Sequence, residues 1–428
     1  MNIVMVTNTY LPHVGGVANS VHAFAEAYRQ RGHTVTVMAP EFENMPESES
    51  DVIRVPAIQN FNGSDFSISL PVTPMVTRKV KALQPDLIHS HHPFLLGDTA
   101  LRMATALGKP LVFTYHTMYE HYTHYVPADS PTIRRFAKQL ATEYCNLCDH
   151  VVAPSESVRD LLRERGVETS VSVVPTGIDP DRFAGGDGAA FRAQWEIPRN
   201  RIVAGHVGRL APEKNGVFLA NALVGFIRAN PERHGALIVG SGASERDMRR
   251  IFELAGVSDR ALFTGKLTGR DLANAYRAMD FFAFASTTET QGMVLAEAMA
   301  AGNPVVALDA PGAREIVHDK KNGRLVMSQE IGPFLDVLVW MAERTSNEMK
   351  ALREEARRTA KGVSIDHCAD AALDVYESLL ARAGVARMRE PDPWETMRTR
   401  LHREWEIWSE RFSALETALT DEEDEKKG

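Results

Sequence analysis

The residues with the clearest chemical potential are two glutamates, Glu289 and Glu297, which are separated by seven residues. The apolar run over residues 281–285 predicts a buried strand, and residues 291–301 predict a helix. Glu289 therefore falls in the turn after the strand, and Glu297 falls in the helix. Gly292 lies between them, where the missing side chain lets a ligand approach the backbone.

Carboxylates at this place suit a ligand rich in hydroxyl groups, because each can accept two hydrogen bonds from a ribose or hexose diol. In an open parallel sheet, ligands bind outside the carboxyl ends of the strands. The helix that follows a strand offers its first N–H groups and the positive end of its dipole to a phosphate or a sugar oxygen. Taken alone, the spacing is equally compatible with two solvated glutamates on a helix.

Strands and helices alternate along most of the chain. Residues 2–8 and 34–39 predict strands, with an amphipathic helix at residues 18–31 between them, which makes a β-α-β unit with a parallel pair. Further strands are expected at residues 86–90, 111–115, 150–154, 171–175, 202–207, 236–239, 261–265 and 304–308. This alternation predicts an α/β protein with two doubly wound, Rossmann-like parallel sheets whose strand ends face each other across a cleft.

The spacing of Glu289 and Glu297 resembles the paired-glutamate motif of the family 4 retaining glycosyltransferases, which have the GT-B fold. Residues 288–292, Thr-Glu-Thr-Gln-Gly, look most like the branch that glycosylates diacylglycerol, as do residues 115–119, Tyr-His-Thr-Met-Tyr. The resemblance covers residues 1 to about 383.

The resemblance implies a set of site residues. It assigns catalytic roles to Arg209, Lys214, His116 and Glu289, and donor binding to Gly15, Gly16, Lys266, Leu267, Gln291, Gly292, Met293, Val294 and Glu297. Arg209 and Lys214 would neutralise a leaving diphosphate, and His116 would approach the reacting hexose. The paired glycines before a helix are expected to allow positive φ and to face the diphosphate.

The phosphate-binding motif departs from the family at one position. Residues 208–214 match the family's Gly-Arg-Leu-x-x-x-Lys-Gly pattern, but Asn215 separates Lys214 from Gly216. Arg209 and Lys214 therefore match the charged positions of the family motif, but the sequence does not define the backbone geometry of the turn at Asn215.

Two groups of residues suggest metal chemistry as an alternative. His89, His91, His92 and His116 cluster at the ends of two predicted strands, but the resemblance gives His116 a different use. Cys145 and Cys148 form a Cys-x-x-Cys at the end of the helix predicted for residues 132–147, where both fall on one face. No second ligand pair has zinc-finger spacing, so we expect packing, no metal and no cofactor.

An aromatic loop follows His116. Tyr119, Tyr122 and Tyr125 have polar tips that suit an amphiphilic acceptor or a bilayer interface, although the loop could also pack over the cleft. A small basic cluster, Arg78, Lys79 and Lys81, predicts a solvated helix face, with attraction to anionic lipid as the alternative.

The predicted organisation has four parts. We expect an acceptor-side domain over residues 1–185, a nucleotide-sugar donor domain over residues 186–365, a closing helix over residues 366–383 that returns to the first domain, and an extension over residues 384–428 with an acidic tail. The extension carries an apolar stripe from Trp394 to Leu419 at helical spacing. Its partner is the protein's own body, a second copy or a lipid surface, and balanced charges favour protein packing.

Composition narrows the functional class. A net charge of −8 without a long basic block argues against nucleic acid as a partner. No apolar run approaches the roughly 20 residues that span a bilayer, and no signal peptide is expected. With three cysteines, a disulfide framework is not expected, which favours the cytoplasm, with peripheral attachment at the inner face of the membrane as an option.

The resemblance implies transfer of a hexose, with retention, from a nucleotide diphosphate sugar. UDP-glucose is the favoured donor and GDP-mannose the alternative, and a membrane lipid such as diacylglycerol is the favoured acceptor. Mannosyl or other hexosyl transfer to phosphatidylinositol or to a soluble acceptor remains an alternative. Rivals outside this reaction are a nucleotide-sugar epimerase on the same fold and a nucleotide-sugar-binding scaffold without transfer.

Overall fold

The computed structural model describes residues 1–386 apart from residues 14, 47, 59–67, 70–73 and 122–129. The chain divides into two units, one formed by Met1–Gly177 with the segment from Ile365 onward, the other by Ile178–Ser364. The sequence-based boundary lay later, after residue 185. The short helix α6 (Pro180–Ala184) belongs to the second unit because its Phe183 packs against Tyr276, with ring centroids 5.6 Å apart.

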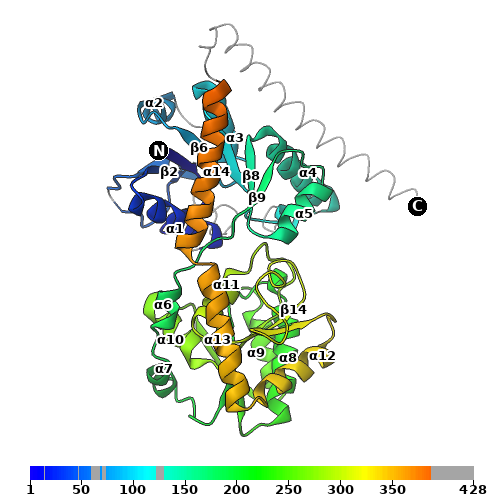
Figure 1. The fold of residues 1–428 in the computed structure, drawn as a ribbon. Helices are drawn as coiled ribbons and strands as arrows, with labels where there is room; N and C mark the ends of the chain where they lie inside the picture. The colour runs from blue at the N-terminus through cyan, green and yellow to red at the C-terminus, as the bar shows by residue number, and fades with distance from the viewer. Residues whose placement is uncertain (14, 47, 59–67, 70–73, 122–129, 387–428) are drawn as a thin grey trace, which may run out of the picture. The chain divides into compact units, whose positions relative to one another are not determined.

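The first unit contains a parallel sheet with strand order β3-β2-β1-β6-β7-β8-β9 (Figure 1). Its strands are β1 (Asn2–Val6), β2 (Thr34–Pro40), β3 (Val52–Val55), β6 (Leu87–Ser90), β7 (Leu111–Thr114), β8 (His150–Ala153) and β9 (Val171–Val173); β4 (Ala57–Ile58) and β5 (Ile68–Ser69) form a separate antiparallel pair. Its helices are α1 (Gly16–Gln30), α2 (Pro74–Ala82), α3 (Leu96–Leu107), α4 (Pro131–Leu147), α5 (Glu156–Glu164) and α14 (Ile365–Ala386). The strand order reverses between β1 and β6, which is where such sheets bind ligands.

The second unit repeats this architecture with strand order β12-β11-β10-β13-β14-β15. Its strands are β10 (Ile202–Val207), β11 (His234–Val239), β12 (Ala261–Gly265), β13 (Phe281–Phe284), β14 (Val305–Leu308) and β15 (Gly323–Val326). Its remaining helices are α7 (Gly188–Gln194), α8 (Gly216–Ala229), α9 (Glu245–Leu254), α10 (Gly269–Ala278), α11 (Met293–Ala300), α12 (Ile331–Ala342) and α13 (Ser346–Gly362). The order reverses between β10 and β13, so the turns after these two strands flank the switch point.

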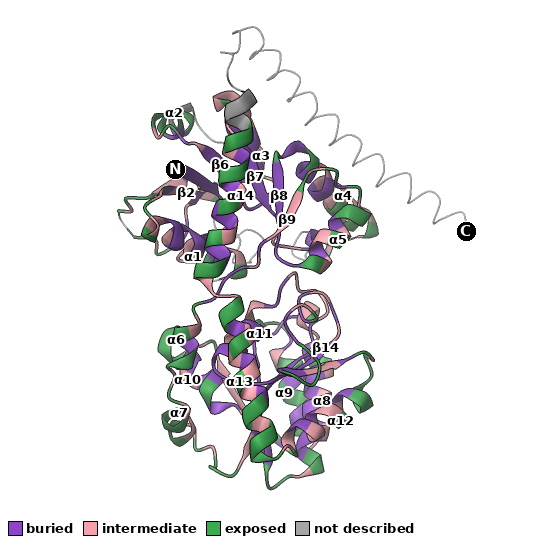
Figure 2. Ribbon diagram, in the orientation of Figure 1, coloured by how far each residue is buried: buried purple, intermediate pink, exposed green. Residues whose placement is uncertain are grey.

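Both faces of the second sheet are covered, which explains why its strands read as continuous apolar runs. Along β13, Phe281 and Ala283 join one core cluster with residues of α8 and α12, whereas Phe282 and Phe284 join the other with residues of α10 and α11. Successive side chains therefore point to opposite faces. Figure 2 shows the strands buried between helices whose outer surfaces are exposed.

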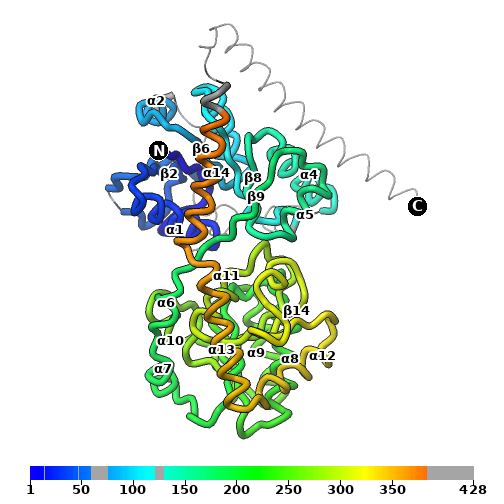
Figure 3. Tube along the Cα trace, viewed as in Figure 1, coloured from blue at the N-terminus to red at the C-terminus, as the bar shows by residue number. Residues whose placement is uncertain are grey.

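The last described helix, α14, packs along α1 of the same unit (Figure 3). The Tyr28 ring lies edge-on to Tyr376, and their hydroxyl oxygens are 3.2 Å apart. At the surface, Arg31 donates to Asp370 Oδ1 at 2.6 Å and to Asp366 Oδ1 at 3.1 Å. These contacts make α14 part of the first unit although 187 residues of the second unit, 178–364, precede it in the chain.

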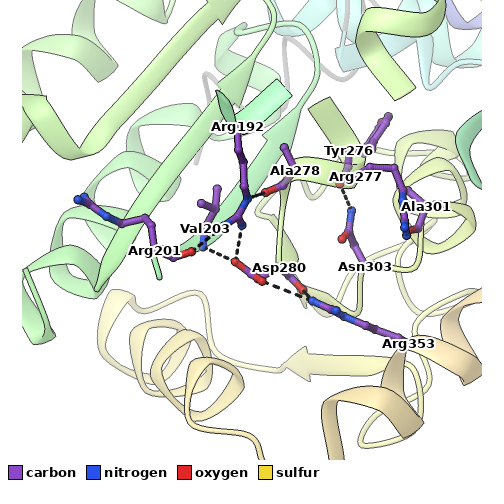
Figure 4. A network of polar contacts seen from close by, with 10 residues as sticks. All are labelled: Arg192, Arg201, Val203, Tyr276, Arg277, Ala278, Asp280, Ala301, Asn303 and Arg353. Atoms are coloured by element: carbon purple, nitrogen blue, oxygen red, sulfur yellow. Dashed lines mark hydrogen bonds and ion pairs between the residues drawn. The ribbon is translucent and has the colours of Figure 1, made fainter. Parts of the chain in front are cut away.

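Asp280 directly precedes β13 and so lies at the amino-terminal ends of the strands, whereas the switch-point turns follow their carboxyl ends. Figure 4 shows its polar contacts. Its Oδ2 accepts hydrogen bonds from the Val203 N–H and from Arg192 Nη2, both at 2.8 Å. Arg353 Nη2 lies 3.4 Å from its Oδ1. The carboxylate thus holds the starts of β10 and β13 and the helices α7 and α13 together.

The predicted packing role of the Cys-x-x-Cys is confirmed. Cys145 and Cys148 are buried free thiols at the end of α4. The Cys148 Sγ–H donates to the Tyr144 carbonyl oxygen at 3.2 Å, which satisfies the thiol within its own helix.

The basic cluster predicted near residue 80 lies on the outer face of α2. Arg78, Lys79 and Lys81 are exposed, whereas Val76 and Val80 on the same helix are buried. Across the part of the chain that the structure describes, no helix combines the length and the apolar character needed to cross a bilayer.

Candidate active site

Glycine shapes the loop after β13. Gly292 has φ +70° and precedes α11, a left-handed conformation that suits glycine. It has no side chain, so α11 begins without a side-chain hydrogen bond from its N-cap residue. Gly312 packs against this loop, since a Cβ there would lie 2.8 Å from the Glu289 Cβ.

The turn after β10 carries the two predicted cations. Gly240 lets the chain after β11 cross this turn closely, because a Cβ at Gly240 would overlap the carbonyl oxygen of Gly208. Arg209 Nη2 donates to Glu213 Oε1 at 2.8 Å, with 44% of the arginine side chain exposed. The sequence analysis did not identify Glu213 as a partner of Arg209. The spacing of four residues between them is the pattern that could have predicted this ion pair.

The backbone conformation of Asn215 explains how the turn accommodates an asparagine where the family motif has a glycine. It has φ +57° and ψ +38°, the left-handed conformation that asparagine tolerates best among residues with a side chain. Its Nδ2 donates to the Ala285 carbonyl oxygen at 3.2 Å. Asparagine therefore supplies the backbone geometry of a glycine and also ties the β10 turn to the β13 loop.

The structure brings Lys214 and Glu289 together. Lys214 Nζ lies 2.6 Å from Glu289 Oε1, and both side chains are 17% exposed. A second bond, from Thr288 Oγ1 to the Glu213 carbonyl oxygen at 3.1 Å, joins the same two loops. Lys214 carries a positive charge that suits a diphosphate, and Glu289 carries a carboxylate that suits sugar hydroxyls. The two side chains meet at the switch point of the sheet.

Glu297 lies in α11 with its carboxylate turned towards α10. Tyr276 donates to Glu297 Oε2 at 2.7 Å. Burial raises the pKa of Glu297 to about 7, and the bond from Tyr276 and the charge of Arg182 oppose this rise. Sequence reasoning missed Tyr276, because only the packing of α10 against α11 brings it to the glutamate.

His206 is a second residue that sequence reasoning missed. It is buried near the end of β10, and its Nδ1 lies 3.1 Å from the Ala283 carbonyl oxygen. Burial lowers its pKa to about 4, and the nearby charge of Lys214 contributes to the shift. The ring is neutral at physiological pH and adds no charge to the switch point.

The predicted base-binding residues follow the edge strand β12. Lys266 is exposed and Leu267 is half-buried. Gly265 has φ +72°, and its carbonyl oxygen accepts a hydrogen bond from the Gly240 N–H at 2.8 Å. This bond places the segment that follows β12 near the carboxyl ends of the strands, where the turn after β10 also lies.

Gly15 and Gly16 lie at the start of α1, and neither uses the positive φ that a glycine pair allows. Gly15 has φ −159°, an extended conformation open to any residue, and Gly16 is absent from the described residues with positive φ. A Cβ at Gly16 would meet no atom within 4 Å, so the space beside it is open. What these two glycines provide is open space beside the start of α1, and not a left-handed backbone conformation.

His116 follows β7 and contacts a second histidine, with its Nε2 2.9 Å from His91 Nδ1. Among the described residues, no three histidine, cysteine or acidic side chains are grouped in a way that could hold a metal ion.

The proposed acceptor residues are only partly described. Tyr119 is buried, and its ring packs edge-on against Phe94 and Tyr115. Tyr122 and Tyr125 lie outside the described residues, as does the apolar stripe from Trp394 to Leu419.

Two family models match the chain, Glycosyltransferase Family 4 over residues 14–182 and Glycosyl transferases group 1 over residues 201–343. The chain is 29% identical to alpha-monoglucosyldiacylglycerol synthase of Streptococcus pneumoniae, over 79% of this chain and 78% of the relative. It is 31% identical to GDP-mannose-dependent alpha-mannosyltransferase of Mycobacterium tuberculosis, over 89% of this chain and 98% of the relative.

Among solved structures, the crystal structure of Anabaena Alr3699/HepE in complex with UDP matches with a TM-score of 0.68 and 22% identity, over 88% of this chain and all of that one. This likeness confirms the predicted fold, and the sequence matches confirm the predicted family. The chain therefore belongs to the family 4 retaining glycosyltransferases and is a hexosyltransferase with the GT-B fold.

Proposed function

We propose that the protein transfers glucose from UDP-glucose to a hydroxyl group of a membrane lipid such as diacylglycerol. The observation that carries the site assignment is the ion pair of Lys214 with Glu289 at the switch point of the second sheet. A nucleotide sugar needs cations at its diphosphate and hydrogen-bond acceptors at its sugar hydroxyls, and this pair supplies both within one contact.

In this proposal, Arg209 and Lys214 bind the diphosphate and stabilise the charge that develops on it as the anomeric C–O bond breaks. Glu289 and the backbone of residues 291–294 orient the hexose. The acceptor oxygen attacks the anomeric carbon from the face that the phosphate leaves, and the acceptor's proton passes to the departing phosphate oxygen. Bond making and bond breaking on one face retain the anomeric configuration.

The other donor contacts follow from position. Glu297 accepts hydrogen bonds from the ribose diol, and the backbone at Lys266 and Leu267 holds the base. Gly15 and Gly16 offer N–H groups at the start of α1 to the diphosphate, and His116 contacts the hexose. These roles are supported by position, because Lys266, Leu267 and His116 follow the carboxyl ends of strands, and Gly15, Gly16 and Glu297 lie at or in the helix that follows a strand.

A lipid acceptor is supported by the name of the Streptococcus pneumoniae relative, alpha-monoglucosyldiacylglycerol synthase, which describes a glucosylated diacylglycerol as the product. The exposed cations of α2, Arg78, Lys79 and Lys81, suit an anionic membrane surface at the inner face of the membrane. We expect peripheral attachment of a cytoplasmic protein, with Tyr119, Tyr122 and Tyr125 in the acceptor region.

A second candidate is mannosyl transfer from GDP-mannose. It is supported by the Mycobacterium tuberculosis relative, which matches 89% of this chain and is named for that donor. Both candidates use the same diphosphate and ribose contacts and differ in the base, the hexose and the acceptor.

A panel assay tests the proposal. The full chain is incubated with UDP-glucose or GDP-mannose, with and without diacylglycerol in anionic vesicles, and released nucleotide and glycolipid are measured. We expect UDP release that depends on diacylglycerol and an α-linked glucolipid. GDP release would favour the second candidate. An altered hexose without an acceptor would indicate an epimerase, and donor binding without turnover would indicate a scaffold.

A further inference from the structure

Three histidine rings lie in a row at the switch point of the first sheet. His89 lies in β6, His91 follows it, and His116 follows the neighbouring strand β7. The ring centroids of His89 and His91 are 4.1 Å apart, and those of His91 and His116 are 5.1 Å apart. His91 is 1% exposed, so its ring is enclosed between the other two.

The inner end of the row is held by hydrogen bonds at both ring nitrogens. His89 Nδ1 lies 2.6 Å from the Tyr376 hydroxyl oxygen, and His89 Nε2 lies 2.7 Å from Thr114 Oγ1. Tyr376 in turn meets Tyr28. The helix α14 therefore holds His89 through Tyr376, and the His89 ring packs against His91 at a tilt of 36°.

At the outer end of the row, His91 Nδ1 lies 2.9 Å from His116 Nε2, within hydrogen-bond distance. His91 Nε2 is buried and has no hydrogen-bond partner. A neutral imidazole carries one N–H and one lone pair, and a buried N–H without an acceptor is the less tolerated of the two. The proton of His91 therefore lies on Nδ1, and His91 donates to His116.

This direction fixes the chemistry of the second ring. Because His116 Nε2 accepts, its own proton lies on Nδ1. Burial keeps both rings neutral, lowering the pKa of His91 well below its ordinary range and that of His116 to about 3. His116 can then donate a hydrogen bond but cannot take up a proton at Nε2 while the bond from His91 persists.

We propose that His91 is a positioning residue, which holds His116 in its Nδ1–H tautomer and so makes it a hydrogen-bond donor to the transferred hexose and not a general base. This inference rests on the proposed contact of His116 with the hexose. It also requires the acceptor's proton to leave by the departing phosphate, because the histidine has no site to receive it.

A matched pair of variants tests the role of His91. His91→Asn keeps an N–H donor near the position of Nδ1, whereas His91→Leu has nearly the same shape as asparagine without a donor. We expect His91→Leu to lose about tenfold in kcat/KM for the nucleotide sugar, the effect of one hydrogen bond, and His91→Asn to recover most of it. Equal kcat/KM for the two folded variants would overturn the proposal.

The control is another buried histidine of the same unit. His150 in β8 is 9% exposed, and its Nε2 lies 2.9 Å from Ser172 Oγ. It is at the amino-terminal end of its strand, away from the row. His150→Leu is expected to lower the melting temperature without changing kcat/KM.

A readout that needs no turnover separates this inference from the proposed function. Nitrogen-15 NMR of histidine-labelled protein, with His116 assigned from a His116→Gln variant, reports which ring nitrogen carries the proton. We expect Nδ1–H in the wild type and in His91→Asn. An Nε2–H tautomer in the wild type would refute the inference even if the enzyme transfers glucose. Absence of all transfer with Nδ1–H present would instead contradict the proposed function alone.

Discussion

The ammonium of Lys214 lies 2.6 Å from the Glu289 carboxylate, and this pair joins the turns after β10 and β13 across the switch point of the second sheet. Both side chains are 17% exposed, so the pair is only partly screened by water. An ammonium carries three N–H donors, and a carboxylate accepts several hydrogen bonds. Lys214 can therefore remain bound to Glu289 while it donates to the diphosphate, and Glu289 can remain bound to Lys214 while it accepts from the sugar hydroxyls.

Replacing Lys214 by alanine should reduce kcat by about 100-fold or more, because the lysine would stabilise charge that appears only as the phosphate departs. Arg209→Ala should act in the same direction. Steady-state release of UDP from UDP-glucose measures both effects. The matched control is Arg246→Ala in α9, whose side chain is 92% exposed. Near-normal turnover of folded Lys214→Ala and Arg209→Ala would remove the basis for the assigned site.

Asn215 offers a test of the turn that carries Lys214. Asn215→Gly and Asn215→Ala both lose the amide bond to the Ala285 carbonyl oxygen, but only alanine adds a Cβ to a left-handed backbone. We expect the alanine variant to be less stable than the glycine variant by about 1–2 kcal/mol and to have the lower activity. Thermal melting and turnover of the pair measure the difference. Equal stability would mean that the turn relaxes away from the left-handed conformation.

Most strands of the second sheet could be predicted because its central strands are buried and read as apolar runs, whereas β15 (Gly323–Val326) was missed because its sequence, Gly-Arg-Leu-Val, is not an apolar run. The positions of Arg209, Lys214 and Glu289 could be predicted because each lies in the turn that follows an apolar strand, β10 or β13. The contact between Tyr276 and Glu297 could not, since it depends on how α10 packs on α11. The backbone conformation of Gly15 could not be predicted, because a glycine pair permits positive φ without requiring it.

The raised pKa of Glu297 predicts opposite pH effects on stability and on binding. In the free protein, burial raises this pKa from 4.5 to about 7, so its contribution to stability is present below 4.5 and is lost as the pH rises through about 7. Ribose hydroxyls donate to the charged form, so donor affinity should increase from about pH 6 to about pH 8.

Calorimetric titration with UDP-glucose across that range measures this second effect, because the diester phosphates of the donor do not titrate there. Glu297→Gln should bind more weakly at high pH and show a flat profile. A wild-type affinity that does not change with pH would contradict the ribose contact of Glu297.

The carboxylate of Asp280, whose contacts Figure 4 shows, should matter for stability and not for transfer, because Asp280 precedes β13 and the switch-point turns follow the other ends of β10 and β13. Asp280→Asn leaves Arg192, which is 16% exposed, without its charged partner and weakens the bond to the Val203 N–H. Loss of a charge-assisted bond at this depth should cost about 1.5–3 kcal/mol. Thermal melting measures the loss, with Asp247→Asn, 59% exposed in α9, as the matched control. The kcat of folded Asp280→Asn should equal that of the wild type, and a selective fall in kcat with unchanged melting would show that this network acts on the site and not on the fold.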